Sequence, residues 1–177
     1  MEPVEINAGE YYLRAFRSDD RIDDGPAVAE AFADPETGRH LPAVRFPDLT
    51  SWREDVRVSW AVCDATTAEL LAGVVLGDLD PRRGRGELTF WTQPAHRGAG
   101  VATTALTSVL GFAFGGLGLH RIVLRHAATN TAARRVAEKC GFTLEGRLRD
   151  ETIIDDQRVD ELLWSRLSTD PPPEQLR

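Results

Sequence analysis

The sequence predicts an α/β (α+β) domain in which a mostly antiparallel sheet is flanked by helices. Apolar runs at 59–63 and 70–76, joined by a polar turn, precede a short strand that starts at Glu87, and this order is typical of an antiparallel meander. That strand ends in a glycine-containing loop that opens a helix with an apolar face. A further strand, a second helix and more strands follow from Arg121 onward.

Composition sets the broad class. The chain has 177 residues, of which 42% are hydrophobic and 28% charged, so we expect one domain over 1–168 and a proline-rich tail over 169–177. It contains neither a run of ~18 apolar residues nor a basic and then apolar start, which predicts a cytoplasmic protein without a membrane partner. The net charge of −7 argues against nucleic-acid binding and suits cationic or amine partners. Cys63 and Cys140 lack metal-ligand spacing, so we expect reduced core thiols and no metal.

The N-terminal region predicts one strand and a broken helix. Residues 11–17 read as the first strand, and Ser18-Asp19-Asp20 supply acceptors for a turn or a helix cap, so the first helix should begin near there. Gly25-Pro26 interrupts that helix, and 26–32 forms a second piece, because proline is tolerated in a first turn.

Two less regular segments follow. Three prolines among polar residues predict a loop over 34–48, and the capping-box pattern of Ser51 and Glu54 predicts a short helix over 51–58. The basic turn at 82–85 is expected to be a solvated hairpin tip, with contact to a phosphate or an acidic partner as the alternative.

The C-terminal half alternates helices and strands. From Val101, apolar residues recur at intervals of three and four over about four turns, and glycines at 115, 116 and 118 end that helix. Asn130 is placed to cap a second helix, and Gly141 supplies its left-handed stop. The strands expected here are 121–126, 143–149, 151–154 and 158–167.

The loop before the first of these helices is suited to an anion. The first amides of a helix lack internal partners and carry the positive end of the macrodipole. Gly98 and Gly100 permit positive φ and close approach of a phosphate, and hydroxyls of Thr103 and Thr104 lie in the first turn. The Lys of a P-loop and the third glycine of a Rossmann motif are both missing, which leaves an ordinary tight turn as the alternative.

The motif Arg97-Gly98-Ala99-Gly100-Val101-Ala102 resembles the pyrophosphate loop of the GNAT superfamily of N-acetyltransferases. Residues 118–122 and 130–142 resemble its RimJ/RimL-type branch, the ribosomal-protein-alanine N-acetyltransferases and their relatives. The resemblance implies a sheet of six to seven strands with splayed central strands, and acetyl-CoA as cosubstrate. The cofactor-binding residues it implies are Trp91, Thr92, Arg97, Gly98, Ala99, Gly100, Val101, Ala102, Thr103 and Asn130.

Catalysis then requires a base for the amine and donors for the thioester oxygen and sulfur. Glu87, on the strand that splays in the family, is the candidate base; the alternative is an exposed charge or an ion pair with Arg85. Asp150, Glu151 and Asp160 are weaker acidic candidates. A backbone amide near Trp91 or Thr92 is the expected oxyanion donor, and Asn130 either meets the CoA arm or only caps its helix.

One position departs from the family pattern. Ala133 replaces the serine that the RimJ/RimL branch places near the sulfur, so Thr129, Thr131, water or the attacking amine would have to protonate the thiolate. Cys140 lies two turns further on and is expected in the core. His96 and His120 have no metal-like partners and are expected in surface or packing roles.

The predicted function is acetyl transfer from acetyl-CoA to a primary amine. A protein N-terminal α-amine is the first-choice acceptor, which rests on the resemblance; a small cationic amine, such as an aminoglycoside or polyamine, is the alternative. Ala133 also leaves open a non-catalytic acyl-CoA sensor or scaffold. A homodimer is possible from the resemblance.

Overall fold

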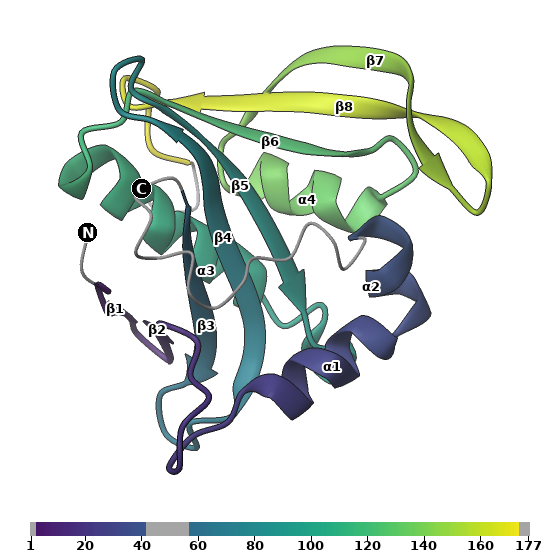
Figure 1. The fold of residues 1–177 in the computed structure, drawn as a ribbon. Helices are drawn as coiled ribbons and strands as arrows, with labels where there is room; N and C mark the ends of the chain where they lie inside the picture. Colours follow the sequence, from purple (N-terminus) through teal and green to yellow (C-terminus); the bar gives the residue numbers. More distant parts are fainter. Residues whose placement is uncertain (1–2, 42–56, 174–177) are drawn as a thin grey trace.

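The computed structural model of the protein describes residues 3–41 and 57–173, which form one eight-stranded sheet with helices on both faces (Figure 1). The spatial order is β1-β2-β3-β4-β5-β6-β8-β7, and every neighbouring pair is antiparallel except β5 and β6. The strands are β1 Ile6–Ala8, β2 Tyr11–Arg14, β3 Val58–Asp64, β4 Leu70–Asp80, β5 Arg85–Thr92, β6 Arg121–Ala127, β7 Thr143–Ile154 and β8 Gln157–Leu167. The mostly antiparallel sheet is confirmed, with more strands than the expected six to seven.

The helices divide between the two faces of the sheet. Helices α3 (Val101–Gly111) and α4 (Thr131–Lys139) cover the face behind the central strands in Figure 1, whereas α1 (Gly25–Ala33) and α2 (Pro35–His40) lie on the near side. A short 3₁₀ turn, Pro94–His96, precedes α3, and a π-helical turn, Phe112–Gly116, continues it. The larger hydrophobic core lies under α3, and a smaller one joins α1 to the other face.

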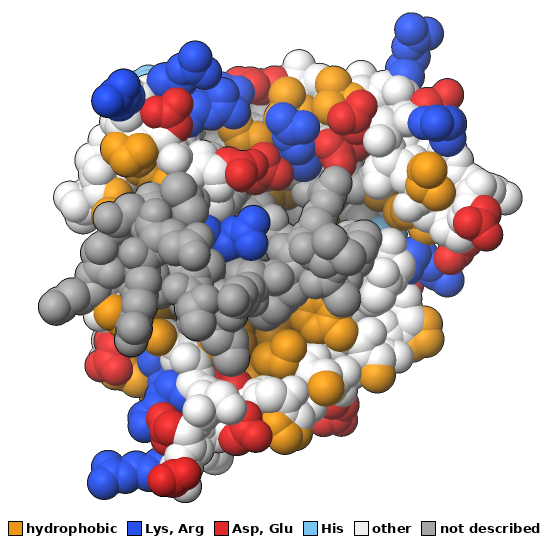
Figure 2. Space-filling view, viewed as in Figure 1, with side chains coloured by type: hydrophobic (Ala, Val, Ile, Leu, Met, Phe, Trp, Pro, Cys, Tyr) orange, Lys and Arg blue, Asp and Glu red, His pale blue; other side chains and the backbone are white. Residues whose placement is uncertain are grey.

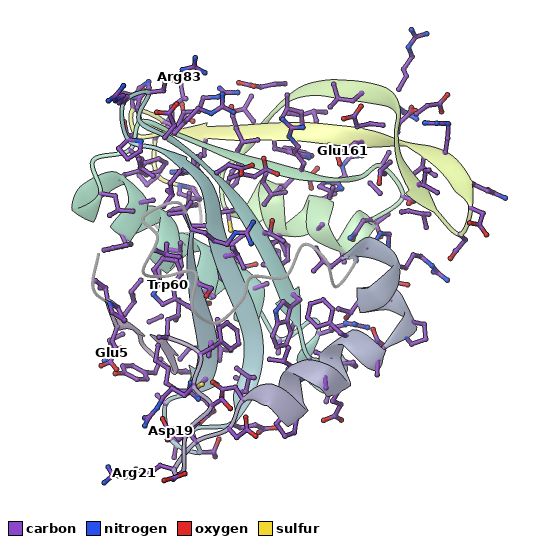
Figure 3. All side chains as sticks on the ribbon, viewed as in Figure 1. Glu5, Asp19, Arg21, Trp60, Arg83 and Glu161 are labelled. Atoms are coloured by element: carbon purple, nitrogen blue, oxygen red, sulfur yellow. The ribbon has the colours of Figure 1, made fainter. Side chains whose placement is uncertain are left out.

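Strand β1 was missed by the sequence analysis because it is only three residues long. Its register is Ile6 against Leu13, and the indole of Trp60 on β3 donates to the carbonyl of Val4 at 2.9 Å (Figure 3). The chain just before the strand is thus held by a contact from 56 residues away, which local periodicity does not contain.

The first helix begins later than predicted. No helix starts at residues 18–20, where the Asp19 carboxylate instead accepts hydrogen bonds from the amides of Arg21 and Ile22 and makes a turn. The buried Asp24 carboxylate forms a two-point ion pair with Arg14 at 2.7 and 2.8 Å, which fixes the chain just before α1. Helix α1 then starts at Gly25 with proline in its first turn, as the expected second piece does.

The prediction of a loop over 34–48 was wrong for its first part, which forms α2. The Asp34 side chain accepts from the amide of Thr37 at 2.9 Å and caps this helix, and Pro35 fits its first turn. The rest of that loop, and residues 51–56 of the expected second helix, lie outside the described residues. Val58 begins β3 rather than ending a helix.

The C-terminal half follows the predicted order. Asn130 Oδ1 accepts from the amide of Ala133 at 2.9 Å and caps α4, and Gly141 has a φ of +75° after that helix. The two strands expected over 143–154 are one strand, β7, whose register shifts between Leu148 and Thr152 because Asp150 takes a positive φ of 54°.

Candidate active site

The two central strands separate in the middle of the sheet. Strands β5 and β6 pair in parallel from Arg85 with Arg121 to Leu88 with Leu124, and no pair follows, although β5 continues to Thr92 and β6 to Ala127. The unpaired halves leave an opening between the strands, which is the splay that the family resemblance implied. Backbone groups inside this opening are available to a ligand.

The direction of the β5 amides decides which of them face the opening. The amide of Gln93 donates to the carbonyl of Leu71 on the β4 side at 2.8 Å. Because amides alternate along a strand, the amide of Trp91 also points to β4, whereas those of Phe90 and Thr92 point toward β6. The indole of Trp91 packs on Gly73, where an added Cβ would lie 2.3 Å from its Nε1. Thr92 is therefore the better placed of the two expected oxyanion donors.

A cavity of about 460 Å³, here called the loop cavity, runs from the glycine loop into this opening. Its wall includes every expected cofactor-binding residue except Ala99. The lining residues include Trp91, Thr92, Arg97, Gly98, Gly100, Val101, Ala102, Thr103, Leu124, His126, Asn130 and Ala133.

The glycine loop has the backbone that the sequence predicted. Gly98 and Gly100 have φ values of +79° and +88°, and an added Cβ at either would meet nothing within 4 Å. The two glycines are thus needed for left-handed backbone rather than for packing, and the space beside them is open. Gly100 precedes the first residue of α3, so unpaired amides of the first turn lie at the wall of the cavity.

Arg97 is tied to α2 in this structure. Its Nη2 contacts the Asp34 carboxylate and donates to Thr37 Oγ1 at 2.8 Å, and the same guanidinium lowers the pKa of Asp34. The expected phosphate ligand thus also fastens α2 across the cavity. Arg135 and Lys139 on α4 line the same cavity and were missed by the sequence analysis, although their spacing of four residues on one helix face after Asn130 signals a shared surface.

A second cavity of about 380 Å³, the acidic cavity, is lined by Glu87. It shares Thr89 and Arg125 with the loop cavity, so the two spaces meet at the separated strands. The other lining residues are Arg57, Val75, Gly77, Asp78, Glu151 and Glu161. Four carboxylates therefore face two guanidinium groups, which favours a cationic occupant.

Glu87 is 25% exposed, and its ion-pair partner is Arg125, with Nε 3.7 Å from Oε2, rather than the Arg85 considered from the sequence. Arg125 also lies 3.8 Å from the carboxylate of Glu161 on β8, a residue only 6% exposed (Figure 3). Acidic and basic side chains intermingle on this part of the surface, over β6 and β8 (Figure 2). A charged residue within the apolar run of β6 was the signal for Arg125, whereas Glu161 lies among other polar residues of β8 and gave no such signal.

The other three acidic candidates do not all lie in the acidic cavity. Glu151 lines the acidic cavity, but Asp150 and Asp160 do not. Asp160 accepts from the amide of Asp150 at 2.9 Å and pairs with Arg147, and these hydrogen bonds lower its pKa. These two aspartates therefore shape β7 and β8.

Both cysteines lie in the core, as expected, and His96 and His120 contact neighbouring side chains. Cys140 is fully buried, and burial raises its pKa to about 11; burial also raises the pKa of Cys63. His96 contacts Glu69 at 3.0 Å, and His120 contacts Ser168 Oγ at 3.0 Å. Among residues 3–41 and 57–173, no group of three or more metal-binding side chains is found, and no helix is long and apolar enough to cross a membrane.

Comparison with known proteins gives one family. Residues 11–143 match the model of the acetyltransferase (GNAT) domain. The chain is 22% identical over 157 residues to the uncharacterized N-acetyltransferase p20 of Bacillus licheniformis, covering 82% of this chain and 88% of that protein. It is 31% identical over 98 residues to the putative ribosomal N-acetyltransferase YdaF of Bacillus subtilis, covering 55% of this chain and 54% of that relative.

The protein also resembles in fold a spermidine N-acetyltransferase from Vibrio cholerae, whose structure was determined in complex with CoA and spermine. The TM-score is 0.78 at 23% identity, with 90% of this chain and 96% of the other covered.

Proposed function

The chain belongs to the acetyltransferase (GNAT) domain family, and we propose that this N-acetyltransferase uses acetyl-CoA to acetylate a protein N-terminal α-amino group. The observation that carries the proposal is the meeting of two cavities at the separated strands β5 and β6. One cavity begins at an open helix N-terminus, and the other holds carboxylates. A thioester and an amine that enter from opposite sides would meet at Thr89 and Arg125.

The loop cavity is the proposed site of acetyl-CoA, which supplies a thioester carbonyl as the electrophile. Unpaired amides at the start of α3 and the open space beside Gly98 and Gly100 suit the diphosphate. Arg135 and Lys139 add positive charge at the wall. The Thr92 amide, which faces the opening, is the proposed donor to the thioester oxygen.

Glu87 is the proposed base. It lies on the acidic side of the opening, within two residues of Thr89, which lines both cavities. The carboxylate lies beside the opening, where it can accept a proton from the amine through water. An ordinary α-amino group has a pKa of about 7.7–8.0, against about 10.4 for a lysine side chain. The base therefore removes a more acidic proton from an N-terminal acceptor than from a lysine.

The four carboxylates of the acidic cavity favour a second candidate acceptor, a small cationic amine such as a polyamine or an aminoglycoside. Asp78, Glu151 and Glu161 stand beside Glu87 and could hold ammonium groups that do not react. The Vibrio cholerae neighbour with bound spermine supports this reading.

Release of CoA thiol from acetyl-CoA would test the proposal with three acceptor sets: peptides with a free N-terminus, polyamines and aminoglycosides. The proposal expects the highest kcat/KM for peptides, and loss of that activity when the peptide N-terminus is blocked. A preference for polyamines or aminoglycosides would select the second candidate. Calorimetric binding of acetyl-CoA without thiol release for any amine would instead identify the non-catalytic sensor or scaffold.

A further inference from the structure

Glu161, on β8, is the most deeply buried carboxylate of the acidic cavity wall. We propose that Glu161 selects acceptors that carry a second cationic group next to the reacting amine. In a protein N-terminus this group is the side chain of a lysine or arginine at the second residue. The inference rests on the proposed function and deepens it, because it names the kind of N-terminus that the acidic cavity takes.

The register of the sheet places Glu161 beside the opening. Pairing between β5 and β6 ends at Leu124, and Glu161 is the register partner of Ala127, three residues further along β6. Register partners point to the same face of a sheet, and Arg125 lies on this face two residues before Ala127. The carboxylates of Glu161 and Glu87 accordingly approach the same guanidinium, at 3.8 Å from Nη1 and 3.7 Å from Nε of Arg125 (Figure 3).

The Glu161 carboxylate is buried without a hydrogen-bond donor among residues 3–41 and 57–173. Its side chain is 8% exposed, and its ion-pair partner Arg125, at 3.8 Å, is further away than a hydrogen bond allows. Other carboxylates of β7 and β8 do accept hydrogen bonds: Asp160 from a backbone amide at 2.9 Å, and Glu145 from Ser165 Oγ at 2.6 Å. A buried carboxylate is costly unless donors are supplied to it. Glu161 therefore faces the acidic cavity as an acceptor that a ligand can satisfy.

The charges of the cavity wall favour a cation as that ligand. The wall holds four carboxylates and two guanidinium groups, so negative charge is in excess. Asp78 and Glu151 are exposed, whereas Glu161 is buried. A cation that enters thus meets exposed carboxylates first and reaches the buried one last. An ammonium or guanidinium group carries several N–H donors and forms its strongest hydrogen bonds with a carboxylate.

The reacting amine and the second cation need separate carboxylates. Glu87 is the proposed base and takes a proton from the amine, so it does not hold a permanent cation as well. Glu161 approaches the other side of the Arg125 guanidinium and is available for the second cation. Consecutive α-carbons of a peptide are about 3.8 Å apart, and a lysine side chain adds a flexible four-carbon stem. A basic side chain at the second residue therefore reaches Glu161 while the α-amine stays at Glu87.

Thiol release from acetyl-CoA with three peptides tests the inference. The peptides start with alanine and differ at the second residue, which is lysine, norleucine or glutamate. We expect kcat/KM for the lysine peptide to exceed that for the norleucine peptide about tenfold or more, because a hydrogen bond between two charged groups is gained. The glutamate peptide should be the slowest. Values within about twofold for all three peptides overturn the inference and leave the proposed function standing.

Glu161→Gln keeps the size of the side chain and removes its charge. The advantage of the lysine peptide should fall to about threefold or less, chiefly through KM, while kcat/KM for the norleucine peptide stays within about threefold of the parent value. Glu138→Gln, which removes an exposed carboxylate outside both cavities, is the matched control and should keep the preference of the parent. A lysine preference that persists in Glu161→Gln overturns the role of Glu161.

Thermal unfolding of Glu161→Gln separates specificity from packing. A lowered melting temperature together with an equal loss of activity for every peptide assigns Glu161 to packing and overturns its role in selection. The comparison of the three peptides in the parent needs no variant, so it decides the inference even where Glu161→Gln does not fold.

Small amines distinguish the source of the second cation. Spermidine carries further amines beside the reacting one, whereas butylamine does not. The inference expects a higher kcat/KM for the lysine peptide than for spermidine. A parent that prefers spermidine to this peptide, and loses its preference for spermidine over butylamine in Glu161→Gln, overturns the peptide as the source. A parent that releases no CoA with any amine overturns the proposed function and this inference together.

Discussion

The Nε atom of Arg125 on β6 lies 3.7 Å from Oε2 of Glu87 on β5, across the only parallel pair of the described sheet. Glu87 is level with Val123, so Arg125 stands two residues further along, on the same face and just past the last paired position. The guanidinium thus faces the point at which the two cavities meet and lies between Glu87 and Glu161. This arrangement keeps the proposed base next to the opening rather than in bulk solvent.

Replacement of Glu87 by Gln keeps the size of the side chain and removes its ability to take a proton. We expect kcat to fall by about 10² or more, and to fall most at low pH, where more of the acceptor is the ammonium form and deprotonation limits the rate. Thiol release measured from pH 6 to 9 checks this. Activity equal to that of the parent over the whole range would remove Glu87 from the mechanism.

Replacement of Gly100 by Val places a branched side chain in the open space at the start of α3. We expect the dissociation constant of acetyl-CoA, measured by calorimetry, to rise more than tenfold, because the side chain blocks the diphosphate from the helix amides.

The control for backbone strain is Gly118→Val. Gly118 also has a positive φ, +65°, with nothing within 4 Å of an added Cβ, and it lies outside both cavities. Both variants should lose stability, because a β-branched residue is strained at positive φ. If they bind acetyl-CoA equally well, the glycine loop does not hold the diphosphate.

Glu145 predicts a dependence of stability on pH. Hydrogen bonds from Arg121 and Ser165 lower its pKa from 4.5 to about 2. The folded state therefore binds this proton less readily than the unfolded state does. The stabilisation is complete above about pH 4.5 and is lost as pH falls toward about 2.

Thermal unfolding of Glu145→Gln followed from pH 7 to 3 tests this. The variant should melt below the parent at pH 7, and the gap should narrow as pH falls below 4.5. Glu138→Gln, which removes an exposed pair with Arg134 on α4, should give a smaller gap. A gap for Glu145→Gln that is constant with pH would show that its ion pair does not set the stability.

Features that depend on neighbouring residues are predictable from the sequence. The glycines before α3, the Asn130 cap and Gly141 act over three or four positions, and each has the backbone or contact that was expected. The elements not predicted are β1 and α2. Strand β1 has only three residues and is preceded by a residue held by the distant Trp60, and α2 is a six-residue helix whose start is capped by Asp34 and tied to Arg97.

The sequence alone determined that a strand runs through a left-handed glycine loop into a helix, because the missing Cβ atoms and the helical period are local properties. Only the tertiary structure decided that Glu87 pairs with Arg125 and that Arg125 also approaches Glu161. These residues come from three strands, β5, β6 and β8, whose order and register are set by long-range pairing and core packing. For the same reason, the structure and not the sequence brought His40 into the cavity that Ala133 lines.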